Sequence, residues 1–475
     1  QEMKVSYNWL RSYLNINQSP DELAEILTDT GLEIEKVEKF ESVPGALEGV
    51  VVGKVVDIWP HPNADKLQVT KVDLGTGDAV QIVCGAPNVA KDQKVLVATV
   101  GTTLVPEPGK PFEIKKAKIR GEESFGMICS EMELGLSKNH DGIAVLPPET
   151  QVGLPAAEYL KIETDYVLEI GLTPNRTDGF SHYGVARDIA ARLNLTQPAI
   201  AKLPELKTQN PNQGTDPKIT VEIKDKQGCG RYAAILIENI KVEPSPDWLQ
   251  NRLKAVGLSP INNIVDITNF VQQETGQPLH AFDADKIAGN KVVIDTLPEG
   301  TTFTTLDGVE RKLSASDLMI CDQNGGMCIA GVFGGAHSGV SNQTQSVFIE
   351  SAWFNPVRIR KTAKRHGLNT DASFRFERGV DPQGVLYSLK RAADLILEIS
   401  GGKIVGPIID IITEIPQPVE LLFDINHFNR LSGATIDPAT LEKILKSLDF
   451  EILEKLKDGV YRLKVPTYRV DVTRE

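Results

Sequence analysis

The sequence has few cysteines, and no two of them are close enough to form a CxxC pair. The five are odd in number and widely spaced, which argues against a disulfide framework or a cysteine zinc site: Cys84, Cys129, Cys229, Cys321 and Cys328. No apolar run approaches the roughly 20 residues that a membrane-spanning helix needs. The first eight residues also lack the basic region and apolar core of a secretory signal. We therefore expect a cytoplasmic protein with reduced thiols.

Positive charge is in deficit, because 51 basic residues stand against 64 acidic ones and give a formal charge of −13. This balance argues against a general nucleic-acid binder, although phosphate responds to local patches rather than to the sum. Two basic runs are present, at residues 110–120 and 358–366, each with five cations. Each run is either a solvated surface or a contact with a nucleic-acid backbone.

The length predicts three or four domains, at roughly 100 to 200 residues each. Short segments rich in Val and Ile, separated by turns, occupy the region of residues 41–151 and predict a small barrel: 49–58, 67–74, 80–84 and 94–100. Residues 198–217 hold four prolines and few large apolar side chains, so we predict a linker there. A mixed region, 218–402, and a small helix-containing segment, 403–475, follow.

One helix-start pattern occurs three times, at Ser19-Pro20, Ser245-Pro246 and Asp437-Pro438. A Ser or Asp side chain can accept a hydrogen bond from a free backbone N–H at a helix start, and proline suits the first helical position. Apolar residues at three- and four-residue spacing follow each start. We predict three short capped helices and infer no duplication from them.

The barrel region carries a recognisable motif. The segment His61-Pro62-Asn63-Ala64-Asp65 is a tight turn between two strands, followed by IVCGAPNV (82–89) and IRGEESFGMICSEMELG (119–135). Together these strings resemble the tRNA-binding domain with an oligonucleotide/oligosaccharide-binding (OB) fold. We interpret His61 as a turn residue rather than a catalyst.

Three further strings resemble the β subunit of bacterial phenylalanyl-tRNA synthetase: MKVSYNWLRSYL (3–14), LEIGLTPNRTDGFSHYGVARDIAARL (168–193) and FRFERGVDP (374–382). The resemblance implies a multidomain α+β protein. In it, the OB-fold barrel (41–151) interrupts an α/β domain (1–40 with 152–197), and after the linker come a mixed α/β editing module of B3/B4 type (218–402) and a small winged-helix-like α+β domain (403–475).

The resemblance also implies a pocket that hydrolyses tyrosine wrongly attached to tRNA(Phe). Its expected catalytic residues are His280, Glu350, Thr370, Thr268 and Asn269, and its expected substrate-binding residues are Glu350, Gly334 and Ala372. The expected tRNA-binding residues are Lys115, Lys116, Lys118, Arg120, Arg358, Arg360, Lys364 and Arg365. Ser259 stands where the family often carries an arginine, which puts one contact to the tRNA end in doubt.

Physical chemistry gives its own reason for a carboxylate in such a site, a role to which Glu350 is suited. Tyrosine differs from phenylalanine by one hydroxyl, and a merely apolar pocket rejects an added hydroxyl only about a hundredfold. A carboxylate that accepts a hydrogen bond from that hydroxyl discriminates far better. Because no serine or cysteine nucleophile is evident, a positioned water is the expected attacking group.

The family's β subunits are longer, so the resemblance implies a parent chain that continues past Glu475. Asp471 matches the first carboxylate of the family's magnesium site, and the others would follow Glu475. One carboxylate cannot hold magnesium without partners, so we expect no binding by these residues alone. ATP is expected to be used by the α subunit of an α2β2 heterotetramer.

Two other interpretations stay open from the sequence. The first is a non-catalytic scaffold that holds tRNA and its partner without editing by itself. The second is a free-standing editing hydrolase that is complete at 475 residues.

Overall fold

The computed structural model describes residues 2–107, 109–139, 141–210 and 213–475. The chain divides into two compact units, one of residues 39–165 and the other of residues 1–38 with 166–475. Within the described ranges, no helix is both long and apolar enough to cross a membrane. The multidomain α+β class predicted above is confirmed. The winged-helix description of the last segment stays a prediction.

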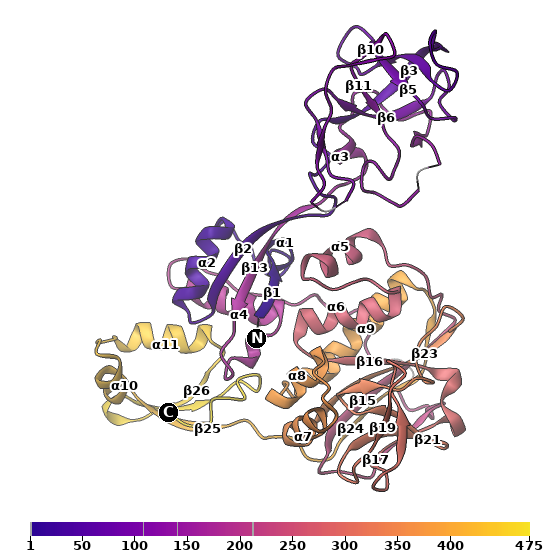
Figure 1. Cartoon of the computed structure of the whole chain (residues 1–475). Helices are drawn as coiled ribbons and strands as arrows, with labels where there is room; N and C mark the ends of the chain where they lie inside the picture. Colours follow the sequence, from indigo (N-terminus) through magenta and orange to yellow (C-terminus); the bar gives the residue numbers. More distant parts are fainter. Residues whose placement is uncertain (1, 108, 140, 211–212) are drawn as a thin grey trace. The chain divides into compact units, whose positions relative to one another are not determined.

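The unit of residues 39–165 is built on an antiparallel sheet with the strand order β11-β6-β3-β4-β5, to which β12 adds by pairing with β6. Figure 1 labels β3, β5, β6 and β11 of this sheet. Strand β6 alternates between two apolar cores, because Leu96 and Ala98 join one while Val95 and Val97 join the other. The bounds are β3 Val50–Pro60, β4 Gln68–Asp73, β5 Val80–Cys84, β6 Lys94–Thr99, β11 Gly126–Ile128 and β12 Val145–Leu146. The four strands predicted here are therefore confirmed.

Short elements complete this unit: β7 Thr103–Leu104 pairs with β8 Phe112–Glu113, β9 Ala117–Ile119 pairs with β10 Glu122–Ser124, and α3 spans Ala156–Tyr159. The turn after β3 holds His61, which is 5% exposed. Its Nδ1 accepts from the Asn63 N–H at 3.0 Å, so Nε2 donates to the Ile119 carbonyl at 2.9 Å. Both ring nitrogens thus serve the turn, and the structural interpretation of His61 is confirmed.

The second unit begins with a three-stranded sheet in the order β1-β13-β2. Its strands are β1 Glu2–Ser6, β13 Thr164–Gly171 and β2 Glu33–Glu41, and its helices are α1 Tyr7–Leu10, α2 Pro20–Asp29, the 3-10 turn Thr177–Gly179, and α4 His182–Leu193. The central strand β13 comes from the chain after residues 41–151. Segments on both sides of the barrel sequence therefore share one sheet.

The predicted helix caps are confirmed in two of the three cases. Ser19 caps α2 and Asp437 caps α11 (Pro438–Ser447), each accepting from the backbone N–H three residues on. The third helix, α5 (Asp247–Ala255), starts after Pro246 and has no side-chain cap. The hydroxyl of Ser245 donates instead to buried Asp266 at 2.6 Å. A tertiary contact has displaced the local one, so that prediction was wrong.

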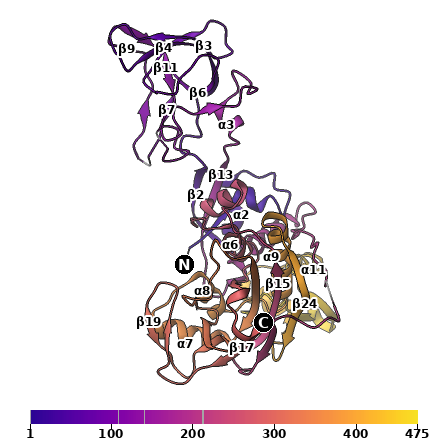
Figure 2. The same cartoon turned by 90° about the vertical axis from the view of Figure 1, so that its right-hand side faces the viewer.

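Two sheets pack face to face in the following region. One has the order β14-β17-β20-β21-β22 and the other β16-β23-β15-β24, whose strands β15 and β24 lie side by side in Figure 2. Their bounds are β14 Thr220–Ile223, β15 Cys229–Glu238, β16 Leu279–Asp283, β17 Lys291–Thr296, β20 Leu318–Asp322, β21 Gly325–Ile329, β22 Phe333–Gly334, β23 Ser346–Phe354 and β24 Lys403–Ile412; the hairpin of β18 Thr302–Thr304 and β19 Glu310–Lys312 flanks them. Strand β24 thus belongs to this sheet, although the predicted domain boundary lies before it.

Helices cover the outer face of the second sheet. Ile349 of β23 and Ala233 of β15 join a core with Ile267 of α6 and Leu389 of α9. On the other face, Phe348 and Tyr232 join a separate core with residues of the first sheet. The helices of this outer face include α6 Asn263–Thr275 and α9 Val385–Ile399. By contrast, α7 Pro356–His366 places its buried apolar residues in the core between the sheets, and α8 Asp371–Arg378 contributes to both cores.

The predicted linker is tied to this region rather than loose. The backbone N–H groups of Lys207 and Thr208 both donate to the Asp394 carboxylate of α9 at 2.8 Å. Residues 211 and 212 of the linker lie outside the described residues.

The last segment is a sheet in the order β25-β27-β26 with two helices, α10 Ile425–Ser432 and α11. Its strands are β25 Glu420–Asp424, β26 Glu451–Lys455 and β27 Val460–Lys464.

Candidate functional site

Glu350 lies in the middle of β23, a strand flanked by β16 and β15. The register sets His280 of β16 opposite it on one side and Ala234 of β15 opposite it on the other. Because strand residues alternate between faces, Glu350 shares its face with Phe348 and Ala352, which join an apolar core. One carboxylate thus interrupts an apolar row.

A cavity of about 340 Å³ opens beside this carboxylate, between the sheet, α6, β22 and the start of α8. This volume is within the range usual for small-molecule sites, roughly 300–1,000 Å³. The cavity is lined by all seven of the predicted pocket residues: Thr268, Asn269, His280, Gly334, Glu350, Thr370 and Ala372. The fold therefore brings together residues that span more than a hundred positions of sequence. Their chemical roles stay predictions.

The carboxyl of Glu350 is held in an unusual state. It is 5% exposed, and burial raises its pKa from 4.5 to about 7, although the neighbouring Tyr232 hydroxyl acts in the opposite direction. Its Oε2 atom is buried and has no hydrogen-bond partner in the described part of the chain. An unpaired buried acceptor costs about 1–3 kcal/mol. The arrangement fits a site that receives a donor from a ligand.

His280 is neutral at physiological pH, because burial lowers its pKa to about 4. The residue as a whole is half-buried, but its Nε2 atom is enclosed and has no hydrogen-bond partner among the described residues. The ring lies edge-on to Phe282, with centroids 4.4 Å apart. At Gly334, an added Cβ would come 3.2 Å from the Cε1 atom of His280. A glycine there keeps the space beside the imidazole open.

The hydroxyls of the two threonines each donate a hydrogen bond to a backbone carbonyl. Thr268 donates to the Val265 carbonyl at 2.7 Å, and Thr370 donates to the Val332 carbonyl at 2.9 Å. Thr370 also caps α8 by accepting from the Ser373 N–H. Both hydroxyls can therefore offer a ligand or water an acceptor rather than a donor. The Asn269 amide makes no hydrogen bond with the residues described and can offer both.

Glu350→Gln is expected to change how stability depends on pH. The carboxyl has a higher pKa when folded than when unfolded, so the folded state binds more protons between pH 4.5 and about 7. Stability from this group therefore falls as pH rises through that window, by up to about 3 kcal/mol. Relative to wild type, Glu350→Gln should gain stability by that amount, measured by urea unfolding at pH 4.5, 6 and 7.5.

His280 contributes to the pH dependence of stability with the opposite sign, since its pKa is lower in the folded state. This contribution is the same in wild type and in Glu350→Gln, so it does not change the difference between them. Exposed Glu398 supplies a control, because Glu398→Gln makes the same chemical change at a carboxyl that is not buried. A stability difference between Glu350→Gln and wild type that does not change with pH would contradict the buried, protonatable state.

Sequence reasoning missed Tyr232, which the fold places against Glu350 from β15. The alternation of side chains along β15 indicates that Tyr232 faces Glu350 only when the pairing of β15 with β23 is known. Ser259 is exposed and is not among the residues that line the cavity.

The predicted tRNA-binding cations differ in their surroundings. On α7, Arg358 pairs with Asp225 at 2.7 Å, and Arg365 pairs with buried Asp317. Arg360 and Lys364 are exposed on the same helix. The predicted cations in the unit of residues 39–165 are all exposed: Lys115, Lys116, Lys118 and Arg120. Nζ of Lys115 lies 3.3 Å from a carboxylate oxygen of Glu113, and Nζ of Lys116 lies 3.1 Å from one of Glu123. Each of the two ion-paired arginines of α7 thus has a structural role within the fold.

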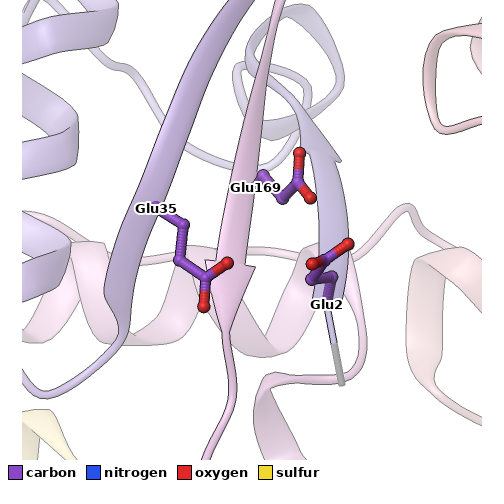
Figure 3. A group of neighbouring side chains, drawn as sticks. All are labelled: Glu2, Glu35 and Glu169. Atoms are coloured by element: carbon purple, nitrogen blue, oxygen red, sulfur yellow. The ribbon is translucent and has the colours of Figure 1, made fainter.

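Asp471, the predicted metal ligand, is held in an ion pair. Its two carboxylate oxygens accept from Nε and Nη2 of Arg469, both at 2.9 Å. A separate carboxylate cluster lies on neighbouring strands of the β1-β13-β2 sheet, where Glu2, Glu35 and Glu169 offer oxygens within 4.8 Å of one another (Figure 3). A hydrogen bond with Glu2 raises the pKa of Glu169. Exposed acidic groups of this kind are common without an ion, and we assign none.

Comparisons with known proteins find three family models in the chain. They are the tRNA binding domain at residues 50–155, the B3/4 domain at residues 228–401 and the tRNA synthetase B5 domain at residues 421–475. The cavity residues all lie within the B3/4 match.

Curated relatives match the chain along its whole length. The phenylalanine–tRNA ligase β subunit of Porphyromonas gingivalis is 54% identical, and that of Bacteroides thetaiotaomicron is 50% identical. The chain covers 57% of the length of each relative. Among solved structures, an N-terminal fragment of the phenylalanyl-tRNA synthetase β subunit from Pyrococcus horikoshii matches 99% of this chain and 95% of its own, at 14% identity and a TM-score of 0.38.

Proposed function

Because this chain is similar over its full length to the N-terminal 57% of phenylalanine–tRNA ligase β subunits, we propose that it serves such a ligase by binding tRNA and by proofreading. The proofreading reaction is hydrolysis of tyrosine from mischarged Tyr-tRNA(Phe). The synthesis of Phe-tRNA(Phe) belongs to the α subunit, which this chain supports in an α2β2 assembly in the cytoplasm.

One observation carries the proofreading proposal: the unpaired, buried Oε2 of Glu350 beside the cavity. A phenol hydroxyl at this position would donate to it, whereas phenylalanine would leave it unpaired. The cost of that unpaired group favours tyrosine over phenylalanine, which is the selectivity that proofreading needs.

The hydrolysis itself needs a water positioned against the ester carbonyl. Cys328 lines the cavity, but burial raises the pKa of its thiol well above the usual value, so it is not a thiolate nucleophile. Nε2 of neutral His280 has no hydrogen-bond partner among the described residues, and it orients the water or the ester together with the amide of Asn269. Water adds to the carbonyl carbon, the ester bond to the ribose oxygen breaks, and that oxygen takes a proton as tyrosine leaves.

ATP and magnesium enter this proposal only through the complete ligase. The residues described around Asp471 do not fit a magnesium site, because both oxygens of this carboxylate already accept from Arg469. No step above uses the metal.

The direct test is a comparison of two substrates. The chain is incubated with Tyr-tRNA(Phe) and, separately, with Phe-tRNA(Phe), and release of labelled amino acid is followed against buffer. We expect tyrosine to be released well above the buffer rate and phenylalanine to be released much more slowly. Release of both at the buffer rate, with tRNA still bound, would overturn the proposal in favour of a scaffold.

The exposed cations of α7 are expected to contribute to tRNA affinity through the phosphate backbone. The double variant Arg360→Ala, Lys364→Ala should weaken tRNA binding and reduce the slope of log affinity against log salt by about one to two. Filter binding at several salt concentrations measures both. Lys457→Ala, at an exposed turn of the last segment, is the control and should leave the slope unchanged. An unchanged slope in the double variant would remove α7 from the tRNA interface.

A further inference from the structure

Tyr232 lies on β15, two residues before Ala234, which is the residue directly opposite Glu350. Side chains two residues apart share one face of a sheet, so Tyr232 and Glu350 are diagonal neighbours on the same face. Long side chains bridge such a diagonal. Tyr232 is 0% exposed and Glu350 is 5% exposed, so the two meet away from water.

Burying the hydroxyl of Tyr232 in this place is unfavourable for the stability of the folded chain. Its ring belongs to an apolar core that includes Phe282, Phe348 and Phe354. A phenylalanine would fill this place without burying a polar atom. Among the residues described, the hydroxyl has no hydrogen-bond partner, and neither has Oε2 of Glu350. The groups that act on the pKa of this hydroxyl are Glu350 and the thiols of Cys229 and Cys328. Glu350 is the strongest acceptor of these three.

We propose that Tyr232 is a positioning residue for the tyrosine-selective pocket: its hydroxyl donates to the Glu350 carboxylate from the β15 side and leaves an oxygen free toward the cavity. The inference deepens the proposed function and rests on it for its biological meaning. Tyr232 would touch neither the ester nor the water, so it acts only through Glu350.

The other titratable groups around Glu350 cannot supply this support. Cys229 on β15 and Cys328 on β21 are neutral, because burial raises their thiol pKa values well above the usual range. His280 on β16 is neutral because burial lowers its pKa to about 4. Asp371, which lines the cavity from α8, carries the same charge as Glu350. In the described structure Tyr232 is therefore the group that offsets the effect of burial on this carboxyl.

Titration of Glu350 in the ligand-free chain tests the inference without any assay of hydrolysis. The carboxyl carbon is followed by 13C NMR from pH 5 to pH 9, with Glu350→Gln to assign the signal. In Tyr232→Phe, the pKa of Glu350 should rise from about 7 to about 8. Tyr461→Phe, another buried tyrosine that contacts a glutamate, should leave it unchanged. An unchanged pKa of Glu350 in Tyr232→Phe would overturn the proposal.

The pH profile of tyrosine release separates positioning from a general loss of structure. At pH 7, Tyr232→Phe should lower kcat/KM for Tyr-tRNA(Phe) about fivefold, and the loss should vanish by pH 8.5 as the carboxyl ionises. An equal loss at every pH would mean a packing role and would count against the inference. If the wild-type chain releases no tyrosine, the proofreading proposal fails, while the titration still decides the role of Tyr232.

Discussion

Replacing Glu350 with alanine is expected to reduce the rate at which the chain hydrolyses Tyr-tRNA(Phe) by about 10- to 100-fold. A hydrogen bond to a charged group contributes about 1.5–3 kcal/mol, and each 1.4 kcal/mol is a factor of ten. The phenol of tyrosine would lose this bond, and the cavity would keep only its apolar contacts. Single-turnover release of labelled tyrosine at pH 7.5 measures the effect on kcat/KM.

Glu350→Gln is the matched control, because it keeps the size of the side chain and a neutral acceptor. Its loss should be smaller than that of Glu350→Ala, since a charged acceptor makes roughly twice as strong a hydrogen bond as a neutral one. The slow release of phenylalanine should change little in either variant. If Glu350→Ala releases tyrosine as fast as wild type while remaining folded by circular dichroism, the carboxylate has no part in recognition.

Arg391→Ala is expected to lower the free energy of unfolding by about 3–5 kcal/mol, because it leaves a buried carboxylate unpaired. Glu274 of α6 has a side chain only 1% exposed, and Nε of Arg391 on α9 donates to it at 2.9 Å. The Tyr13 hydroxyl donates to the other oxygen at 2.9 Å, and the Trp9 indole donates to that hydroxyl at 2.5 Å. This network joins the segment of Trp9 and Tyr13, in and just after α1, to the helices α6 and α9 that cover the second sheet.

Urea unfolding at pH 7 measures the loss, and two controls sharpen it. Glu398→Ala breaks an exposed ion pair between α9 and Lys207 and should change stability little. The double variant Arg391→Ala, Glu274→Gln removes the unpaired charge and should recover part of the loss. A double variant no more stable than Arg391→Ala would show that packing, not the charge, causes the effect.

Local chemistry made the elements of the fold predictable where no distant contact competed. The strands of the barrel unit and the caps at Ser19 and Asp437 follow from side-chain patterns within a few residues. Ser245 does not follow the same rule, because its hydroxyl donates a hydrogen bond to Asp266, 21 residues away. Likewise, the ion pair of Arg358 with Asp225 spans 133 residues, and no local pattern reveals it.

The pocket residues were named through resemblance, while the chemistry of Glu350 could be argued from its charge alone. What the sequence could not supply was the register that sets His280 and Glu350 opposite each other. Strand pairing between distant segments depends on the whole core rather than on the two strands. The protonation state of the Glu350 carboxyl depends on its burial between paired strands. The position of Tyr232 beside it likewise follows only from the pairing of β15 with β23.

The sheet order β1-β13-β2 has a consequence for how the protein is made. The chain leaves this sheet through β2 and returns through β13, its neighbour, after the barrel strands have been synthesised. Domains generally fold as units while the chain emerges from the ribosome. The inserted barrel is therefore synthesised before its host sheet is complete, and β1 and β2 lack the strand between them until a later part of the same polypeptide emerges.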